Sequence, residues 1–134
     1  MAAMKSMSYG IALLLATCLP LAPVAWAGND AAISQSQLME SLESSQAPAL
    51  IDVRTPEEFQ SGHIPGAINI PLQSFPRRLS ELAAYQDREV VLYCEVGGRA
   101  TQGSRWLASR GFQQIRLLDG HMSAWRGAGL PTER

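Results

Sequence analysis

Apolar runs typical of buried strands alternate with helical patterns along most of the chain. Four short runs of mainly aliphatic residues predict strands at 49–53, 67–70, 89–93 and 115–118. Apolar residues at helical spacing and helix-start signals between and around them predict helices at 34–44, 55–61, 77–85, 99–110 and 123–126. Strands that alternate with helices indicate a parallel sheet covered on both faces.

Two of the predicted helices begin with a capping box. Ser34 stands three residues before Gln37, and Thr55 stands three residues before Glu58, so each side chain can satisfy a free amide of the first turn. Glycines mark helix ends at 62 and 111. In a parallel sheet, ligands bind at the carboxyl ends of the strands, which points to the turns after residues 53, 93 and 118.

The first 27 residues have the pattern of a secretory signal. Lys5 is the only charged residue before Asp30, an apolar run covers 11–19, and Ala-Trp-Ala at 25–27 offers a cleavage site. The run has about half of the roughly 20 residues that a membrane anchor needs. We therefore expect a signal peptide at 1–27 and a mature domain at 28–134.

Cys18 allows a second interpretation of the N-terminus. The string Leu-Ala-Thr-Cys at 15–18 resembles a bacterial lipoprotein signal, although such signals usually carry Gly, Ala or Ser where Thr17 stands. If cleavage follows Ala27, Cys94 is the one cysteine left. An unpaired cysteine in an exported chain indicates a reactive thiol or an intermolecular bridge, and the alternative is a buried, inert thiol.

Composition narrows the function classes. The chain has 134 residues, which suits one domain, and its formal charge of −1 becomes −2 when Lys5, its only lysine, is removed. This gives no electrostatic reason to expect nucleic acid as a partner. Two cysteines are too few for a disulfide scaffold or a cysteine zinc site, and the two histidines show no metal-ligand spacing, so we expect no metal.

The turn after the strand at 89–93 holds the candidate chemistry. Cys94 follows that strand directly, and a helix begins after Glu95, Val96, Gly97, Gly98 and Arg99. Glycines let successive amides point inward, and a helix N-terminus adds unpaired N–H groups. We expect this cradle, with Arg99 as a fixed cation, to lower the thiol pKa below about 8.5 and to stabilise a persulfide. A plain strand-to-helix turn is the alternative.

A phosphatase loop also needs a thiolate, an amide cradle and an arginine. Only four residues separate Cys94 from Arg99, one fewer than in phosphatase loops, and the smaller ring suits a single sulfur atom better than a phosphate. Glu95 beside the thiol would also repel a multiply charged phosphate.

Three ordered stretches resemble the rhodanese family of thiosulfate sulfurtransferases, and most of all its small, secreted, single-domain bacterial members. They are IDVRTPEEF with GHIPGAINIP at 51–71, YCEVGGRA at 93–100 and LDGHMSAW at 118–125. The resemblance implies a three-layer α/β fold, with a parallel sheet of about five strands and helices on both faces. It also implies that Cys94 takes the outer sulfur of thiosulfate as a persulfide, without a cofactor.

The resemblance further implies partners and a location. A small-molecule sulfur donor and a thiol or cyanide acceptor are expected, with a sulfur-accepting protein as a further candidate partner. The expected location is the periplasm, without membrane attachment after cleavage. The Cys94 loop, residues 94–99, is the expected substrate site. A persulfide carrier or redox module with little thiosulfate turnover is the alternative function.

Some residues near the expected cleft have less specific roles. The family commonly has Gly-Gly where this chain has Gly120-His121; we expect His121 to be a surface turn residue, the alternatives being crowding of the cleft rim or proton donation near the sulfur. Asp52 and Arg54 are expected to organise loops, and His63 to pack in a turn. The tryptophans at 106 and 125 are expected in the core.

Overall fold

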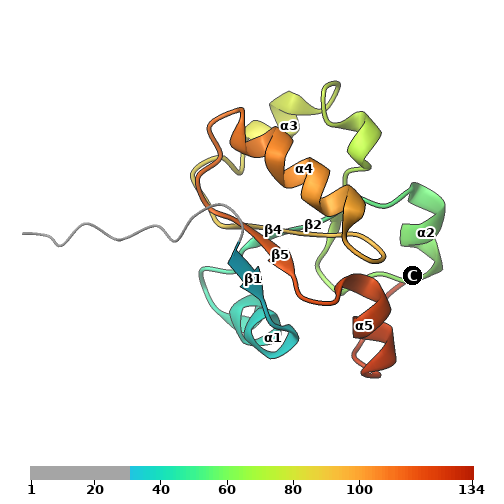
Figure 1. Cartoon of the computed structure of the whole chain (residues 1–134). Coiled ribbons are helices and arrows are strands. Elements are labelled where there is room, and N and C mark those ends of the chain that lie inside the picture. Colours follow the sequence, from blue (N-terminus) through green and yellow to red (C-terminus); the bar gives the residue numbers. More distant parts are fainter. Residues whose placement is uncertain (1–30) are drawn as a thin grey trace, which may run out of the picture.

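The structure is a computed structural model, and it describes residues 31–134. The predicted signal peptide and Cys18 lie outside these residues. Five strands form one sheet in the order β1-β5-β4-β2-β3, and every neighbouring pair is parallel (Figure 1). The strands are β1 (Ala31–Ile33), β2 (Ala49–Asp52), β3 (Ile68–Asn69), β4 (Val90–Tyr93) and β5 (Ile115–Leu118).

Helices connect the strands as the alternating pattern predicts. They are α1 (Gln35–Glu43), α2 (Pro56–Ser61), α3 (Leu79–Ala83), α4 (Gly98–Ala108) and α5 (His121–Gly127), with a short 3₁₀ turn η1 (Leu72–Ser74) before α3. Both capping boxes are present: the Ser34 hydroxyl accepts the Gln37 amide at 3.2 Å, and the Thr55 hydroxyl accepts the Glu58 amide at 3.2 Å. No helix among residues 31–134 has the length and apolar character needed to cross a membrane.

Several local features differ from the sequence prediction, among them α3, which covers Leu79–Ala83 and not 77–85. β1 was not predicted; its three residues carry no pattern of their own, and they become a strand by pairing with β5, Ala32 lying opposite Leu117. η1 was not predicted either. α5 begins at His121, two residues before the predicted start, because amides of its first turn find acceptors in the loop after β4.

Each face of the sheet has its own core. Along β4, Val90 and Leu92 join Cys94 in the cluster under α3 and α4, whereas Val91 and Tyr93 pack with α1 and α5 on the opposite face. Figure 1 shows these two pairs of helices on opposite sides of the sheet. Trp125 is 1% exposed, which confirms its predicted place in the core, and Trp106 is only partly buried. The three-layer α/β prediction is confirmed.

The sheet order places Cys94 at the point where the winding direction of the sheet changes. From β2 the chain continues to β3 on one side, and from β4 it continues to β5 on the other, so β2 and β4 are the neighbours at which the winding direction changes. Their ends are level, since Asp52 lies opposite Tyr93. Ligands bind outside the carboxyl ends of strands at such a point.

Candidate active site

Cys94 lies at the first position after β4, with its side chain almost fully buried at 1% exposure. Its sulfur accepts a hydrogen bond from the Gly97 amide at 3.0 Å. Burial raises the pKa of the thiol, but the His121 side chain and the Ala100 and Gly97 amides together lower it more, and the pKa is about 7. The thiolate is therefore well populated near neutral pH.

The two glycines of the Cys94 loop have different roles. Gly97 has φ of 127°, a conformation that side chains disfavour, and a methyl group on it would lie 3.0 Å from His121 Nε2. Gly98 begins α4 with no positive φ and with open space where a side chain would project. The expectation that both glycines supply unusual backbone angles is thus right for Gly97 and wrong for Gly98.

Amides of α5 bind the carbonyl side of the Cys94 loop. The Met122 amide donates to the Cys94 carbonyl at 3.0 Å, and the Ser123 amide donates to the Glu95 carbonyl at 3.1 Å. These bonds satisfy two of the unpaired N–H groups at the start of the helix. They turn the two carbonyl oxygens toward α5, so amides rather than carbonyls remain available to the sulfur.

His121 corrects a sequence prediction. It is 8% exposed rather than on the surface, and its Nδ1 accepts the Cys94 amide at 3.2 Å. Its ring lies against Gly97, and its backbone has φ of 52°. The only sequence signal was the larger side chain at a position usually held by glycine; its burial depends on how α5 packs against the Cys94 loop.

Arg99 is held in place by an acidic partner that the sequence did not reveal. Its guanidinium donates two hydrogen bonds to Glu58 of α2, at 2.6 and 3.0 Å. The bonds from Arg99 lower the pKa of Glu58 to about 2, with smaller effects from burial, which raises it, and from Thr55. Arg99 is thus the fixed cation that was predicted, but Glu58 balances its charge.

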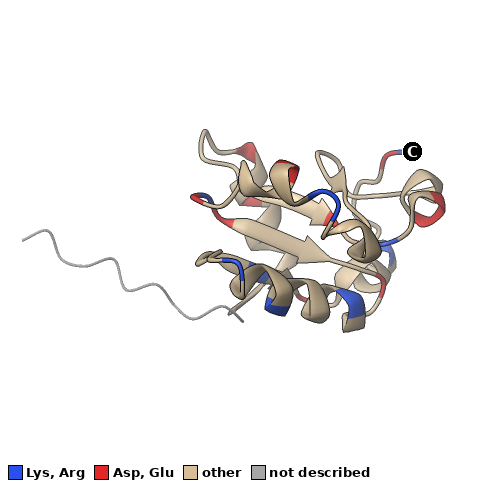
Figure 2. Ribbon diagram, turned by 90° about the horizontal axis from the view of Figure 1, so that it is seen from above, with Lys and Arg blue, Asp and Glu red and all other residues tan. Residues whose placement is uncertain are grey.

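Glu95 points away from the thiol, toward two arginines. Its carboxylate pairs with Arg126 of α5 and lies 3.4 Å from Arg54 Nη1. The buried Arg54 in turn donates to Asp52 at 2.7 Å and to the Gly62 carbonyl at 2.8 Å, which confirms that Asp52 and Arg54 organise loops. Acidic and basic residues occur together around this edge of the sheet (Figure 2).

A cavity of about 310 Å³ adjoins the Cys94 loop on the side of Glu95. Arg54, Glu95, Met122 and Arg126 are among the residues that line it. Val96 at the tip of the loop is 78% exposed. The Cys94 loop thus has a buried sulfur at Cys94, a charged side chain lining the cavity at Glu95 and an exposed apolar side chain at Val96.

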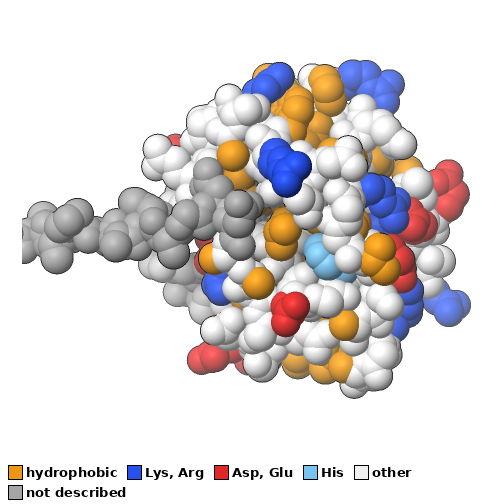
Figure 3. Space-filling view, in the orientation of Figure 1, with side chains coloured by type: hydrophobic (Ala, Val, Ile, Leu, Met, Phe, Trp, Pro, Cys, Tyr) orange, Lys and Arg blue, Asp and Glu red, His pale blue; other side chains and the backbone are white. Residues whose placement is uncertain are grey.

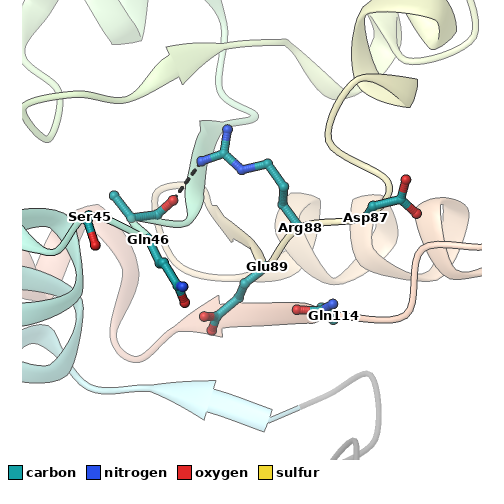
Figure 4. A pocket seen from close by; sticks show the side chains of 7 residues that line it. Ser45, Gln46, Asp87, Arg88, Glu89 and Gln114 are labelled. Atoms are coloured by element: carbon teal, nitrogen blue, oxygen red, sulfur yellow. Dashed lines mark hydrogen bonds between the residues drawn. The ribbon is translucent and has the colours of Figure 1, made fainter.

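The other candidate features lie outside this site. His63 stacks on Phe59 with ring centroids 3.6 Å apart, which confirms its packing role. A larger cavity, about 560 Å³, lies before the amino ends of β2, β4 and β5, where Arg88 donates to the Ala47 carbonyl (Figure 4). Residues 31–134 contain no group of three His, Cys, Asp or Glu side chains that could hold a metal.

Charged side chains of both signs are interspersed with hydrophobic ones on the face shown in Figure 3. The described part of that face has no continuous basic surface.

Comparison with known proteins identifies the family. The model of the rhodanese-like domain matches residues 34–128. The chain belongs to the rhodanese-like domain family. A sulfurtransferase of Allochromatium vinosum is 36% identical over 99 residues, which cover 74% of this chain and 91% of that protein. The chloroplastic thiosulfate sulfurtransferase 16 of Arabidopsis thaliana is 36% identical over 93 residues, covering 62% of this chain and 78% of that protein.

A solved structure supports the same assignment. The rhodanese-like domain described here superposes on a thiosulfate sulfurtransferase from Pseudomonas aeruginosa with a TM-score of 0.71 and 28% identity, over 78% of this chain and 20% of that chain. The domain therefore has the rhodanese fold, and its relatives include sulfurtransferases.

Proposed function

We propose that this protein is a thiosulfate sulfurtransferase that carries sulfane sulfur as a persulfide on Cys94. The supporting observation is the position of the Cys94 sulfur, which is buried at the carboxyl end of β4 and bound by the Gly97 amide at 3.0 Å. A thiol with a pKa of about 7 is about half ionised at neutral pH and its thiolate is nucleophilic.

In the first half-reaction, the Cys94 thiolate attacks the outer sulfur of thiosulfate. A bond forms between the two sulfur atoms, the sulfur–sulfur bond of thiosulfate breaks, and sulfite leaves with the bonding electron pair. The persulfide anion that remains keeps the single negative charge of the thiolate. Inward-facing amides of the Cys94 loop can stabilise that charge without reorganising.

In the second half-reaction, a thiophilic acceptor attacks the outer sulfur of the persulfide. With cyanide the products are thiocyanate and the Cys94 thiolate; with a thiolate acceptor they are a new persulfide and the same Cys94 thiolate. Atoms and charge balance in both cases, and no metal or organic cofactor takes part. Residues 95–99 of the Cys94 loop serve as the substrate site.

Loop length favours sulfur over phosphate. Four residues separate Cys94 from Arg99, and one amide of this small ring already contacts the sulfur. The charge of Glu95 is weaker evidence than the sequence suggested, because Arg54 and Arg126 compensate it. The preference therefore depends on the ring size.

The test is turnover of thiosulfate with cyanide by the chain that begins at Gly28. We expect wild-type protein to form thiocyanate, and Cys94→Ser to lose this activity while keeping the wild-type melting temperature. An intact-mass spectrum after thiosulfate treatment should show one added sulfur atom in the wild type and none in Cys94→Ser. Full activity of Cys94→Ser would overturn the proposal.

We further propose that the protein acts in the periplasm after removal of residues 1–27. The sequence pattern around Ala-Trp-Ala at 25–27 carries this proposal. Expression of the full chain in a bacterium should yield a periplasmic product that starts at Gly28, both for the wild type and for Cys18→Ser. A lipid-modified product that starts at Cys18, and is absent from Cys18→Ser, would favour the lipoprotein alternative.

A persulfide carrier that docks on a partner protein is the second candidate. Val96 of the Cys94 loop is 78% exposed and stands two residues after Cys94, so a partner protein that docks over the sulfur would contact it. Val96→Asp should then weaken sulfur transfer to a protein acceptor far more than it weakens thiosulfate–cyanide turnover. Equal loss of both activities would contradict the carrier role.

A further inference from the structure

His121 holds an unusual backbone conformation at the candidate site. Among the described residues it is the only one other than glycine with a positive φ, at 52°. Glycine and asparagine adopt this region more readily than histidine. Such conformations persist where surrounding contacts enforce them, and they cluster at functional sites.

The contacts of the ring fix which nitrogen carries its hydrogen. Nδ1 accepts the Cys94 amide at 3.2 Å, so in the neutral ring the hydrogen resides on Nε2. Nε2 faces Gly97, where an added methyl group would lie 3.0 Å from it. The Gly97 amide is the group that donates to the Cys94 sulfur at 3.0 Å. The ring therefore spans from the first amide of the Cys94 loop to the segment that holds the sulfur.

We propose that neutral His121 is a positioning residue for the Cys94 sulfur, with Nδ1 fixing the first amide of the loop and Nε2–H donating a hydrogen bond to the thiolate or persulfide. The persulfide part rests on the proposed function. Because Nδ1 accepts the Cys94 amide, the hydrogen of the neutral ring is on Nε2, and His121 acts as a donor and not as a general base.

The electrostatics of the thiol agree with this role. Burial raises the pKa of Cys94, and the His121 side chain is the strongest of the groups that lower it, ahead of the Ala100 and Gly97 amides. A neutral donor stabilises the sulfur anion through a hydrogen bond. It adds no net charge beside the loop, where Arg54 and Arg126 already compensate Glu95. The same bond serves the thiolate before sulfur arrives and the persulfide afterwards.

The test is the pH dependence of Cys94 alkylation by iodoacetamide in the chain that begins at Gly28. This measurement needs no sulfur donor, so it tests the role of His121 separately from the proposed function. The role of His121 can be refuted while thiosulfate turnover is observed, and it can be supported while thiosulfate turnover is absent. His121→Gly removes both ring contacts; we expect the midpoint to move from about 7 toward about 8.5, with alkylation at pH 7 slowed about tenfold. His63→Asn, at the other buried histidine, is the matched control and should keep the wild-type midpoint.

Two further variants separate the ring nitrogens. His121→Asn can still accept the Cys94 amide but is too short to reach Gly97, so we expect a raised midpoint. His121→Gln places an amide donor nearer the position of Nε2 and should restore part of the shift. Gly and Asn suit the positive φ, so both variants should melt at or above the wild-type temperature even though their thiols are less acidic.

Opposite results would show a purely structural role. Unchanged midpoints in both His121→Gly and His121→Asn would overturn the proposal, whatever their melting temperatures. Should His121→Gly fail to fold, His121→Asn decides alone, and a midpoint equal to that of the wild type would overturn it.

Discussion

Glu58 and Arg99 join the starts of α2 and α4 through two parallel hydrogen bonds of 2.6 and 3.0 Å. Both side chains are about one-third exposed, which limits the free energy of the pair. The pair nevertheless ties the helix that begins at the Cys94 loop to the segment after β2. The starts of α2 and α4 are thereby held together.

Glu58→Gln should lower the free energy of unfolding by about 0.5–1 kcal/mol at pH 7. The folded-state pKa of Glu58, about 2, lies below its ordinary value of 4.5, so the contribution is complete above about pH 5 and is lost as pH falls toward 2. Urea unfolding of both proteins should therefore converge at low pH. Glu57→Gln, on the exposed side of the same helix, should change little at either pH.

Asp52→Asn should destabilise the fold by about 3 kcal/mol, because it leaves the buried Arg54 guanidinium without its carboxylate. Chemical unfolding at pH 7 measures this loss. The matched control is Glu81→Gln, which breaks the exposed pair with Arg78 and should cost less than about 1 kcal/mol. Equal losses in the two variants would mean that burial of the Asp52–Arg54 pair does not increase its contribution to the free energy of unfolding.

Gly97→Ala should damage the site and the fold together. Its φ of 127° and its approach to His121 predict a loss of about 1–3 kcal/mol, and displacement of the amide on the sulfur predicts at least about tenfold slower sulfur transfer. Gly98→Ala is the control for stability, since α4 has room for a methyl group there. Thermal melts should show no loss for Gly98→Ala; a loss equal to that of Gly97→Ala would refute the assignment.

Stability should also depend on pH through Cys94. The pKa of the thiol is about 7 in the folded chain, below its ordinary value of about 8.5, so the unfolded chain binds more protons between these values. The free energy of unfolding should then rise by about 2 kcal/mol from pH 6 to pH 9 relative to Cys94→Ala, and fall again on acidification. Denaturant titrations across this range check it; parallel curves for the two proteins would exclude a stabilised thiolate.

Local patterns predicted the main frame of this fold. The apolar run that ends at Tyr93, the two capping boxes and the turn glycines each act within a few residues, so the sequence reveals them. β1 was missed because its three residues become a strand only by pairing with β5, which lies more than eighty positions later in the chain.

The sequence predicts the nucleophile of the site but not the residues that surround it. Cys94 and Gly97 stand in one short segment whose geometry follows from strand, turn and helix. The partners of Arg99, Glu95 and Cys94 are Glu58, Arg126 and His121, which come from distant elements. Only the packing of α2 and α5 against the loop brings them together.

The bonds from α5 to the Cys94 and Glu95 carbonyls have a consequence for how this fold can change. They anchor two consecutive peptide groups of the loop to a helix that lies beyond the following strand. A longer loop could keep both bonds only by placing the extra residue after Glu95. The start of the ring around the sulfur is therefore fixed by a helix that is not part of the ring, and a change in ring size must either fall among residues 96–98 or shift α5.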